Sequence, residues 1–440
     1  MRLATSHPLV EELIGLSFIL NTFAAVWLYT VLTPAALEAT KALVRLVLQR
    51  EREGNLGAPA GLRQQLDAVP KEALLAAIRR HRLECLLHGD PIVASLLPEL
   101  AATLQVLARQ DAMAALALAS LTREMAALFE QAAMPMLVIK GIPLALQTTG
   151  SLTSRGRGDL DLLVDPKRLP AAVALLESVG FEKTYGPSCM GTDSPQGKYS
   201  QFVSIELSLV RLRGQRQWID LHWHVSHARG VLPTFNGLWN NRDYVDINGT
   251  SVATLSLENA FVHACCHAAA DCWMCIRNLV DVERLTQRLN PQDLEALQKK
   301  RLVRKTSAVA NNCVTNPILQ SKLVAPPIST YTRSLCAARE AQILPWRSLG
   351  TGEWTFRNRI KYSLRLLNLS RHPAHLASML MQHLIPPDLL LSQETGETIS
   401  IRIVILRRVH KLIWRIRGGD VRPPHPACRL PAASKPCQPA

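Results

Sequence analysis

Two aspartates separated by one residue, Asp159 and Asp161, are the side chains of this sequence best suited to chemistry. They begin residues 159–164, DLDLLV, which have the composition of a buried β-strand. Alternate side chains of a strand project to one face, so we expect both carboxylates together and Leu160 and Leu162 on the opposite, buried face. Adjacent carboxylates need a compensating cation, and a divalent ion bound through oxygen, such as Mg²⁺, is the natural one. The alternative is an ordinary pair of surface aspartates at a strand edge.

A third carboxylate is expected on a neighbouring strand. Residues 217–225, QWIDLHWHV, alternate between apolar and polar side chains, as a half-buried strand does. Asp220, His222 and His224 form the polar face of that strand. Placed beside the first two aspartates, Asp220 would complete the acidic cluster that supports phosphoryl transfer with two metal ions.

The elements before the aspartates suit the handling of phosphate. Residues 136–139 form a short apolar run that predicts a buried strand, and it ends at Lys140 and Gly141. Pro143 then favours the first turn of a helix, and residues 148–158 are polar and contain glycine, which indicates a loop. The backbone N–H groups at the start of such a helix are suited to binding phosphate.

Taken in order, these residues resemble the polymerase-β-type nucleotidyltransferase superfamily. More narrowly, they resemble the bacterial family called uncharacterised nucleotidyltransferases, with its Lys-Gly, its Arg four residues before Asp-x-Asp, and its later acidic-Leu-His-Trp strand. The matching residues are Lys140, Gly141, Arg155, Asp159, Asp161, Asp220, Leu221, His222 and Trp223. The wider superfamily usually has Gly-Ser where this chain has Gly141 and Ile142, so a serine hydroxyl is missing from that phosphate site.

The resemblance implies an α+β fold with a polymerase-β-like nucleotidyltransferase core, a small mixed sheet with helices, flanked by N- and C-terminal helical regions. It implies transfer of a nucleoside monophosphate from an NTP to an unidentified acceptor, with Mg²⁺ or Mn²⁺ and release of pyrophosphate. The acceptor is a small molecule, a peptide, a protein or RNA. The implied metal ligands are Asp159, Asp161 and Asp220, and the last also helps to deprotonate the acceptor. Lys140, Gly141 and Arg155 are implied to bind the phosphates.

Residues 258–285 are expected to be helical and contain a second set of reactive side chains. His263 and His267 lie four residues apart on one helix face, and Cys272 and Cys275 have Cys-x-x-Cys spacing. A zinc site is one interpretation, and small apolar core residues are the other. The same family resemblance extends here to a His-x3-His helix followed by Trp, Arg and Asp. It implies that His267 and Arg277 reach the triphosphate or the acceptor, with an Arg277–Asp281 pair on the helix as the alternative.

The chain divides by composition into four regions: helical residues 1–130, an α/β core at 131–250, a helical subdomain at 251–340, and a basic helical region at 341–440 that ends in a disordered tail. Helices are predicted at residues 35–52, 71–88, 104–131 and 168–179, and strands at 181–185 and 200–212. The basic cluster of residues 79–82 is expected to be a solvated helix face, with binding of the second substrate as the alternative.

Composition places the protein in the cytoplasm, with membrane association as an alternative. The 10 cysteines are irregularly spaced, which favours reduced thiols. Of the formal charge of +15, +10 lies in residues 341–440, which hold 15 Lys and Arg against 5 Asp and Glu. Residues 399–417 predict a basic amphipathic helix suited to peripheral contact with an anionic membrane. Residues 13–37 contain no charged side chain, which fits either a membrane span or a buried helix.

Three rival functions stay open at this point. The first is a catalytically inactive nucleotide-binding regulator, which metal-dependent NTP turnover would separate from the enzyme. The second is a membrane-associated accessory or scaffold protein that uses the apolar N-terminus and the basic C-terminus. The third, a nucleic-acid-modifying transferase, rests on net charge alone, because no basic stripe interleaved with aromatic residues is present.

Overall fold

A computed structural model describes residues 33–54, 56–156, 158–184, 191–213, 215–313, 367–384 and 406. The described helices are α2 (Pro34–Glu53), α3 (Leu62–Asp67), α4 (Lys71–Arg80), α5 (Glu84–His88), α6 (Pro91–Leu96), α7 (Pro98–Gln131), α8 (Ile142–Thr149), α9 (Leu169–Ser178), α10 (Pro195–Val203), α11 (Phe235–Asn240), α12 (Leu257–Ala270), α13 (Ile276–Arg288), α14 (Pro291–Gln298), α15 (Arg301–Cys313) and α18 (Pro373–Leu384). The strands are β1 (Met136–Val138), β2 (Leu160–Val164), β3 (Glu182–Lys183), β4 (Glu206–Arg213), β5 (Gln215–His222), β6 (Arg242–Ile247) and β7 (Thr250–Leu255).

One mixed sheet organises the α/β region, with the strand order β3-β4-β5-β2-β1-β7-β6. Strand β2 is antiparallel to β1 and parallel to β5, and the register places Asp161 directly beside Asp220. Strand β1 is parallel to β7, which pairs in turn with β6 as an antiparallel hairpin. The two central strands, β1 and β2, therefore have partners on both sides, and their backbone polar groups are paired within the sheet.

Helices cover both faces of the sheet. Leu137 and Leu163 pack in a hydrophobic core shared with the N-terminal helices and α12–α15. Val138 and Leu162, the next residues along the same strands, pack in a second core with α7 and α9. Because successive side chains of a strand point to opposite faces, neighbouring residues of β1 and β2 pack in different cores. Asp161 lies two residues before Leu163 on β2, so its carboxylate is on the same face of the sheet, which α12 and α13 cover.

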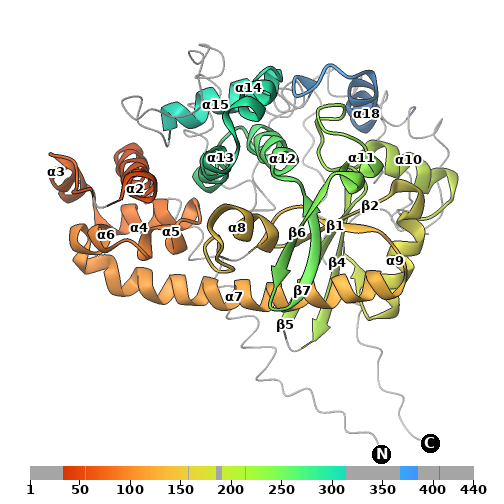
Figure 1. Cartoon of the computed structure of the whole chain (residues 1–440), viewed down its shortest axis with the longest axis horizontal. Coiled ribbons are helices and arrows are strands. Elements are labelled where there is room, and N and C mark those ends of the chain that lie inside the picture. Colours follow the sequence, from red (N-terminus) through yellow and green to blue (C-terminus); the bar gives the residue numbers. More distant parts are fainter. Residues whose placement is uncertain are drawn as a thin grey trace, which may run out of the picture.

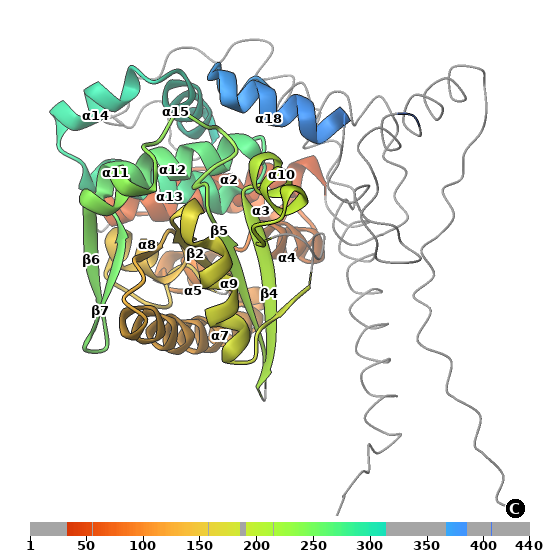
Figure 2. The same ribbon diagram turned by 90° about the vertical axis from the view of Figure 1, so that its right-hand side faces the viewer.

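The long helix α7 connects the N-terminal helices to the sheet. Figure 1 shows it running past α4, α5 and α6 and then across the strands, and it contacts α5 and β7. Figure 2 shows α12–α15 gathered near the opposite end of the strands from α7. Among the described helices, α7 is the one long and apolar enough to cross a membrane by length and composition alone.

Several predicted elements are confirmed. The helices predicted at residues 35–52, 104–131 and 168–179 correspond to α2, α7 and α9, and the mixed α/β character is confirmed. The predicted strand at 217–225 is β5, which ends at His222, and residues 181–185 contain the short strand β3.

Three predicted elements are wrong in part. The strand predicted at residues 200–212 is confirmed from residue 206, where β4 begins. Residues 71–88 form two helices, because Arg82 adopts a left-handed conformation (φ 55°) that ends α4 and starts the turn into α5. Residues 200–203 belong to helix α10, whose start is favoured by Pro195 and by the Ser194 hydroxyl, which accepts a hydrogen bond from the Gly197 N–H. Residues 258–285 form two helices, α12 and α13, separated by a turn in which Cys272 and Trp273 have positive φ.

The predicted region boundaries lie partly beyond what the structure describes. Strand β7 crosses the boundary predicted between residues 250 and 251, because it pairs with β1 and β6 inside the same sheet. Apart from residue 406, residues 399–417 are outside the described residues, as are residues 13–32. The predictions of a basic amphipathic helix, a disordered tail and an N-terminal span therefore stay predictions.

Candidate functional site

Asp161 is the centre of the candidate site. Its side chain is 2% exposed, and its Oδ1 atom lies 2.8 Å from Lys140 Nζ and 3.1 Å from His222 Nε2. Burial opposes ionisation of the carboxyl group, but the Lys140 charge and the His222 hydrogen bond outweigh it and hold the Asp161 pKa well below its usual value. Asp161 is therefore a buried, ionised carboxylate at physiological pH.

His222 extends this ionic network to a second strand. Its Nδ1 atom lies 3.3 Å from Glu206 Oε2, while Nε2 faces Asp161. Burial disfavours the charged imidazole, but Glu206 and Asp161 together raise the His222 pKa. Glu206 and His222 are register partners on β4 and β5, which is why the two side chains meet.

The other two predicted aspartates have different surroundings from Asp161. Asp159 precedes β2 instead of lying in it, and its side chain is exposed, so the prediction that residues 159–164 form one strand is wrong by one residue. Asp220 is half-buried on β5 and accepts a 2.6 Å hydrogen bond from Ser208 Oγ. Burial raises the pKa of Asp220. Asp159 and Asp161 line one cleft together, whereas Asp220 lies beside Asp161 and outside the cleft lining.

Lys140 and Gly141 form the turn between β1 and α8. Gly141 has φ 69° and ψ −124°, a conformation that glycine adopts far more readily than other residues. A Cβ atom there would lie 3.5 Å from the Asp159 carbonyl oxygen, an ordinary contact, so the backbone conformation is the reason for glycine. The turn directs Lys140 toward Asp161 and places the N-terminus of α8 at the edge of the cleft.

Arg155 connects the loop before β2 to helix α13. Its Nε and Nη2 atoms donate to Asp281 Oδ1 and Oδ2 at 2.8 and 2.6 Å, a bidentate pair. Both carboxylate oxygens of Asp281 accept from Arg155. Arg277 Nη1 donates to the Arg155 backbone carbonyl at 3.1 Å. Both arginines line the cleft.

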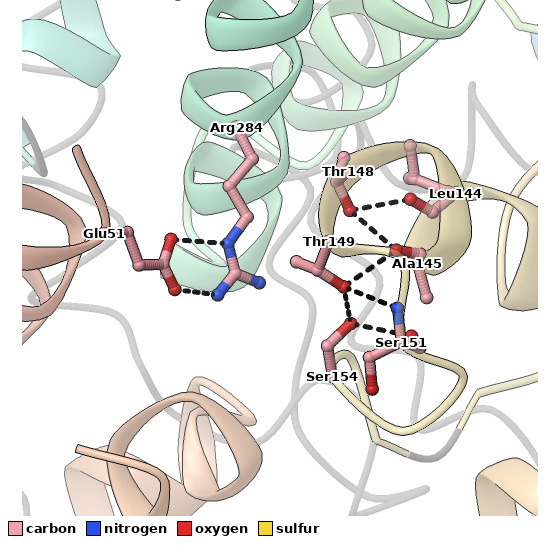
Figure 3. Close-up of polar contacts among 8 residues, drawn as sticks. All are labelled: Glu51, Leu144, Ala145, Thr148, Thr149, Ser151, Ser154 and Arg284. Atoms are coloured by element: carbon pink, nitrogen blue, oxygen red, sulfur yellow. Dashed lines mark hydrogen bonds and ion pairs between the residues drawn. The ribbon is translucent and has the colours of Figure 1, made fainter.

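Further polar contacts hold helix α13 and the loop after α8 in place. Figure 3 shows Arg284 of α13 reaching Glu51 of α2, while Thr149 and Ser154 connect the end of α8 to the loop that follows it. Thr149 Oγ1 donates to Ser154 Oγ at 2.7 Å and Arg284 Nε to Glu51 at 3.1 Å. The Arg284 contact fixes α13 against α2, and the Thr149 contact fixes the loop that carries Arg155 against the end of α8.

The two histidines of α12 are stacked, with ring centroids 6.3 Å apart and an interplanar angle of 11°. His267 lines the cleft, and His263 is buried behind it. Burial lowers the pKa of His263 to about 3, with a further contribution from the Lys140 charge. The His267 ring is accessible to solvent, but enclosure by the cleft walls and the Lys140 charge lower its pKa well below the usual value. Both rings are therefore neutral at physiological pH.

Three cysteines of this region are core residues, whereas Cys275 is partly buried and lines the cleft. Cys265, Cys266 and Cys272 are buried, and burial raises the pKa of the Cys266 thiol to about 12. Within the described part of the chain, no three His, Cys, Asp or Glu side chains are grouped as a metal site. The zinc interpretation of the Cys-x-x-Cys spacing therefore has no support here, and the apolar core interpretation does.

The cleft between these elements has a volume of about 170 Å³. One wall comes from the β1–α8 turn and the Asp159 loop, and the other from the ends of α4 and α12 and the start of α13. Of the predicted site residues it is lined by Lys140, Gly141, Arg155, Asp159, Asp161, His267 and Arg277. The structure adds Asp271, Met274, Cys275 and Asn278, which were not predicted for the site, and also Arg80, His81 and Arg82, whose binding of the second substrate was an alternative prediction. The prediction that residues 79–82 are a solvated face is wrong for His81, which is 2% exposed, whereas Arg82 is exposed. Three of the four residues line the cleft, and their binding of the second substrate stays a prediction.

The donor atoms of the site are consistent with a hard divalent ion. Asp159 and Asp161 both present carboxylates to the cleft, and oxygen ligands are those that Mg²⁺ and Mn²⁺ prefer. Lys140 and His222 both contact Oδ1 of Asp161, and no described residue donates a hydrogen bond to Oδ2. Binding of an ion by Asp161 is thus compatible with the Lys140 contact. Among the described residues, Asp159, Asp161 and Asp220 are not grouped as a three-ligand metal site, so Asp220 as the third ligand stays a prediction.

Comparison with known proteins identifies the family of the chain. The family described as uncharacterised nucleotidyltransferase matches residues 67–308, which is 242 of the 440 residues and includes every cleft residue named above. The chain belongs to this family. No curated protein matches it. A crystal structure of an antigenic nucleotidyltransferase-like protein from Paracoccidioides brasiliensis is similar at 14% identity over 49% of this chain and 95% of that chain, with a TM-score of 0.32.

Proposed function

We propose that the protein is a metal-dependent nucleotidyltransferase that moves a nucleoside monophosphate from an NTP to an acceptor and releases pyrophosphate. The observation that carries the proposal is the buried, ionised carboxylate of Asp161, which opens on the cleft beside Asp159 and is held by Lys140 at 2.8 Å. Family membership supports nucleotidyl transfer as the class of reaction.

The residues of the cleft have separate roles in this proposal. Asp159 and Asp161 would hold Mg²⁺ or Mn²⁺, with Asp220 as a third ligand, and the ion would neutralise the charge of the phosphates. Gly141 and the start of α8 receive the phosphate chain through backbone N–H groups, and His267 and Arg277 face it from the opposite wall. Lys140 and Arg155 stabilise the negative charge that develops during transfer.

The bond changes follow the usual course of in-line displacement. The acceptor nucleophile attacks the α-phosphorus, a new bond to phosphorus forms, and the bond to the bridging oxygen breaks. Pyrophosphate leaves with the electron pair, and the acceptor proton passes to Asp220 and then to solvent. The cleft walls hold the reactants in a fixed geometry, which accounts for a large part of the rate enhancement in reactions of this kind. The acceptor is a small molecule, a peptide, a protein or RNA.

The test is incubation of the full chain with each α-labelled NTP, Mg²⁺ or Mn²⁺, and cell extract as the source of acceptor. Asp161→Asn is expected to abolish labelling, and Glu182→Gln, which neutralises an exposed carboxylate on the edge strand β3, is expected to retain it. Absence of labelling and of pyrophosphate release with every nucleotide would contradict the proposal.

One observation favours a second candidate, a nucleotide-binding regulator without catalysis. Lys140 and His222 already balance the charge of Asp161, so the buried carboxylate does not require a metal ion for its stability. For this candidate, NTP binds to the purified protein and is recovered intact after long incubation with the metal. Turnover in the same sample would exclude it.

A further inference from the structure

The wall of the cleft contributed by the N-terminal helices contains a buried hydrogen-bond donor without an acceptor. His81 ends α4, its side chain lines the cleft, and it is 2% exposed. Its Nδ1 atom accepts a 3.4 Å hydrogen bond from the Ile276 N–H, the first N–H group of helix α13. A neutral imidazole that accepts at Nδ1 carries its proton at Nε2. Nε2 has no hydrogen-bond partner in the described part of the chain, so no described residue accepts from the N–H group it carries.

The imidazole of His81 is neutral at physiological pH. Burial, together with the charges of Arg80 and Lys41, lowers its pKa to about 3. A buried N–H donor without an acceptor is costly, and native proteins rarely leave one unless a ligand or water completes it. His81 lines the cleft, so a ligand bound there is the candidate acceptor for Nε2–H.

The surroundings of His81 indicate that this acceptor is an anion. The N-terminus of the 13-residue helix α13 meets the cleft at Cys275, Arg277 and Asn278, and its backbone N–H groups and dipole favour negative charge. Arg82 also lines the cleft, and its side chain makes no hydrogen bond or ion pair with the described residues. By contrast, Lys140 and Arg155 are paired with Asp161 and Asp281.

Arg82 occupies a backbone position that normally belongs to glycine. The Leu83 N–H donates to the Ile78 carbonyl and the Arg82 N–H to the Arg79 carbonyl, the two bonds of a Schellman helix end. The left-handed residue of this motif, here Arg82 at φ 55°, is usually glycine. An arginine at this position keeps a guanidinium at the cleft against the local backbone preference, which indicates a use for its side chain.

We propose that His81, Arg82 and the N-terminus of α13 form a phosphate-binding subsite on the wall of the cleft opposite Lys140 and Asp161. The Nε2–H group of His81 and the backbone N–H groups of α13 donate to phosphate oxygens, and Arg82 supplies the charge that compensates them. The identity of the phosphate rests on the proposed function: it belongs either to the polyphosphate of the NTP or to a phosphate-bearing acceptor. The N-terminal helical region is therefore part of the substrate site.

Direct binding to the full chain tests the subsite without any requirement for turnover. Radiolabelled inorganic phosphate is measured by equilibrium dialysis at constant ionic strength with the wild type, Arg82→Gly, His81→Phe and Arg79→Ala. Arg82→Gly removes the guanidinium and suits the left-handed backbone, so it folds at least as well as the wild type. Arg79→Ala removes the same charge from the last turn of α4, three residues before Arg82, at a position outside the cleft lining.

The proposal predicts at least tenfold weaker phosphate binding for Arg82→Gly and for His81→Phe, and wild-type binding for Arg79→Ala. Equal losses in Arg82→Gly and Arg79→Ala, which indicate net charge alone, or no loss in Arg82→Gly, would overturn it. A repeat in saturating ATP with Ca²⁺ identifies the source of the phosphate. Competition between phosphate and ATP assigns the subsite to the NTP, and binding of phosphate to the ATP-loaded protein assigns it to the acceptor. Because none of these measurements needs transfer, the subsite and the proposed reaction succeed or fail separately.

Discussion

Arg155 Nη2 lies 2.6 Å from Asp281 Oδ2, and this pair joins the loop that precedes the Asp159–Asp161 pair to the helix that forms the opposite wall of the cleft. Both side chains are buried, at 10% and 4% exposure. The two residues are 126 positions apart in the sequence, so the pair fixes the relative position of two distant elements of the site. Burial and a bidentate geometry distinguish it from the surface ion pairs of the same chain.

Asp281→Ala is expected to lower the free energy of unfolding by about 3–5 kcal/mol, because the guanidinium of Arg155 would stay buried without its partner. Urea denaturation followed by circular dichroism measures the change. The matched control is Asp67→Ala, whose partner Arg63 is 56% exposed and lies 3.3 Å away, and whose loss is expected to cost no more than about 1 kcal/mol. Similar values for the two variants would show that the buried pair has no structural role.

The sequence predicted the parts of the site whose local pattern determines their geometry. Short-range patterns predicted the apolar strand before Lys140 and Gly141, the alternating strand of Asp161 and the strand of Asp220. When β2 and β5 pair in the sheet, their register places Asp161 beside Asp220. Lys140, Gly141 and Arg155 came from family resemblance, and the structure places all three at the cleft.

The helix ends that form the opposite wall were not predicted, although His267 and Arg277 on that wall were. Residues 71–88 and 258–285 read as continuous amphipathic helices, since Arg82, Cys272 and Trp273 carry no glycine or proline signal for the turns they form. Tertiary packing overrides their local preference and ends both helices at the cleft. The pairing of Arg155 with Asp281 is likewise a long-range contact that helical spacing could not reveal.

Asp161 is expected to make stability depend on pH in the acid range. Its pKa in the folded protein is below that of an unfolded aspartate, 3.8, so the unfolded chain binds the proton first as the pH falls. The stability that the ionised carboxylate contributes is therefore present above about pH 4 and is lost as the pH decreases toward the folded pKa. The difference in unfolding free energy between wild type and Asp161→Asn, measured by urea denaturation at pH 5.5, 4.5 and 3.5, should narrow with decreasing pH. A constant difference across these three values would contradict the lowered pKa.

His263 is expected to make stability depend on pH over a higher pH range than Asp161 does. An unfolded histidine titrates near 6.5, whereas burial lowers the pKa of His263 to about 3, so between these values the unfolded state binds a proton that the folded state does not. Stability therefore falls as the pH falls below 6.5, by at most about 1.4 kcal/mol per pH unit for this one group. His263→Gln removes the titration and is expected to give a shallower dependence between pH 6.5 and 4.5. An unchanged slope in the variant would mean that His263 is protonated in the folded protein.

Lys140→Met is expected to reduce nucleotidyl transfer by about 10²–10³-fold, the usual effect of removing one group that stabilises developing charge. The methionine has a similar length and lacks the charge that contacts Asp161 at 2.8 Å. Initial rates of pyrophosphate release measure the effect. Lys183→Met, which removes a lysine on the edge strand β3 away from the cleft, serves as the control and should match the wild type. Equal rates for both variants would remove Lys140 from the proposed mechanism.

Arg82→Gly is expected to stabilise the fold while it weakens the binding of phosphate. A non-glycine residue in the left-handed region costs roughly 1–2 kcal/mol, and the greater freedom of glycine in the unfolded chain offsets part of the gain. A net increase of about 0.5–1 kcal/mol in the free energy of unfolding is therefore predicted from urea denaturation. Asn248→Gly is the matched control, because Asn248 has φ 52° in the turn between β6 and β7, and asparagine tolerates this conformation. Its stability should change by a smaller amount. If Arg82→Gly instead lowers stability, the Arg82 side chain stabilises the folded protein through contacts of its own, and its unfavourable backbone conformation no longer points to a ligand.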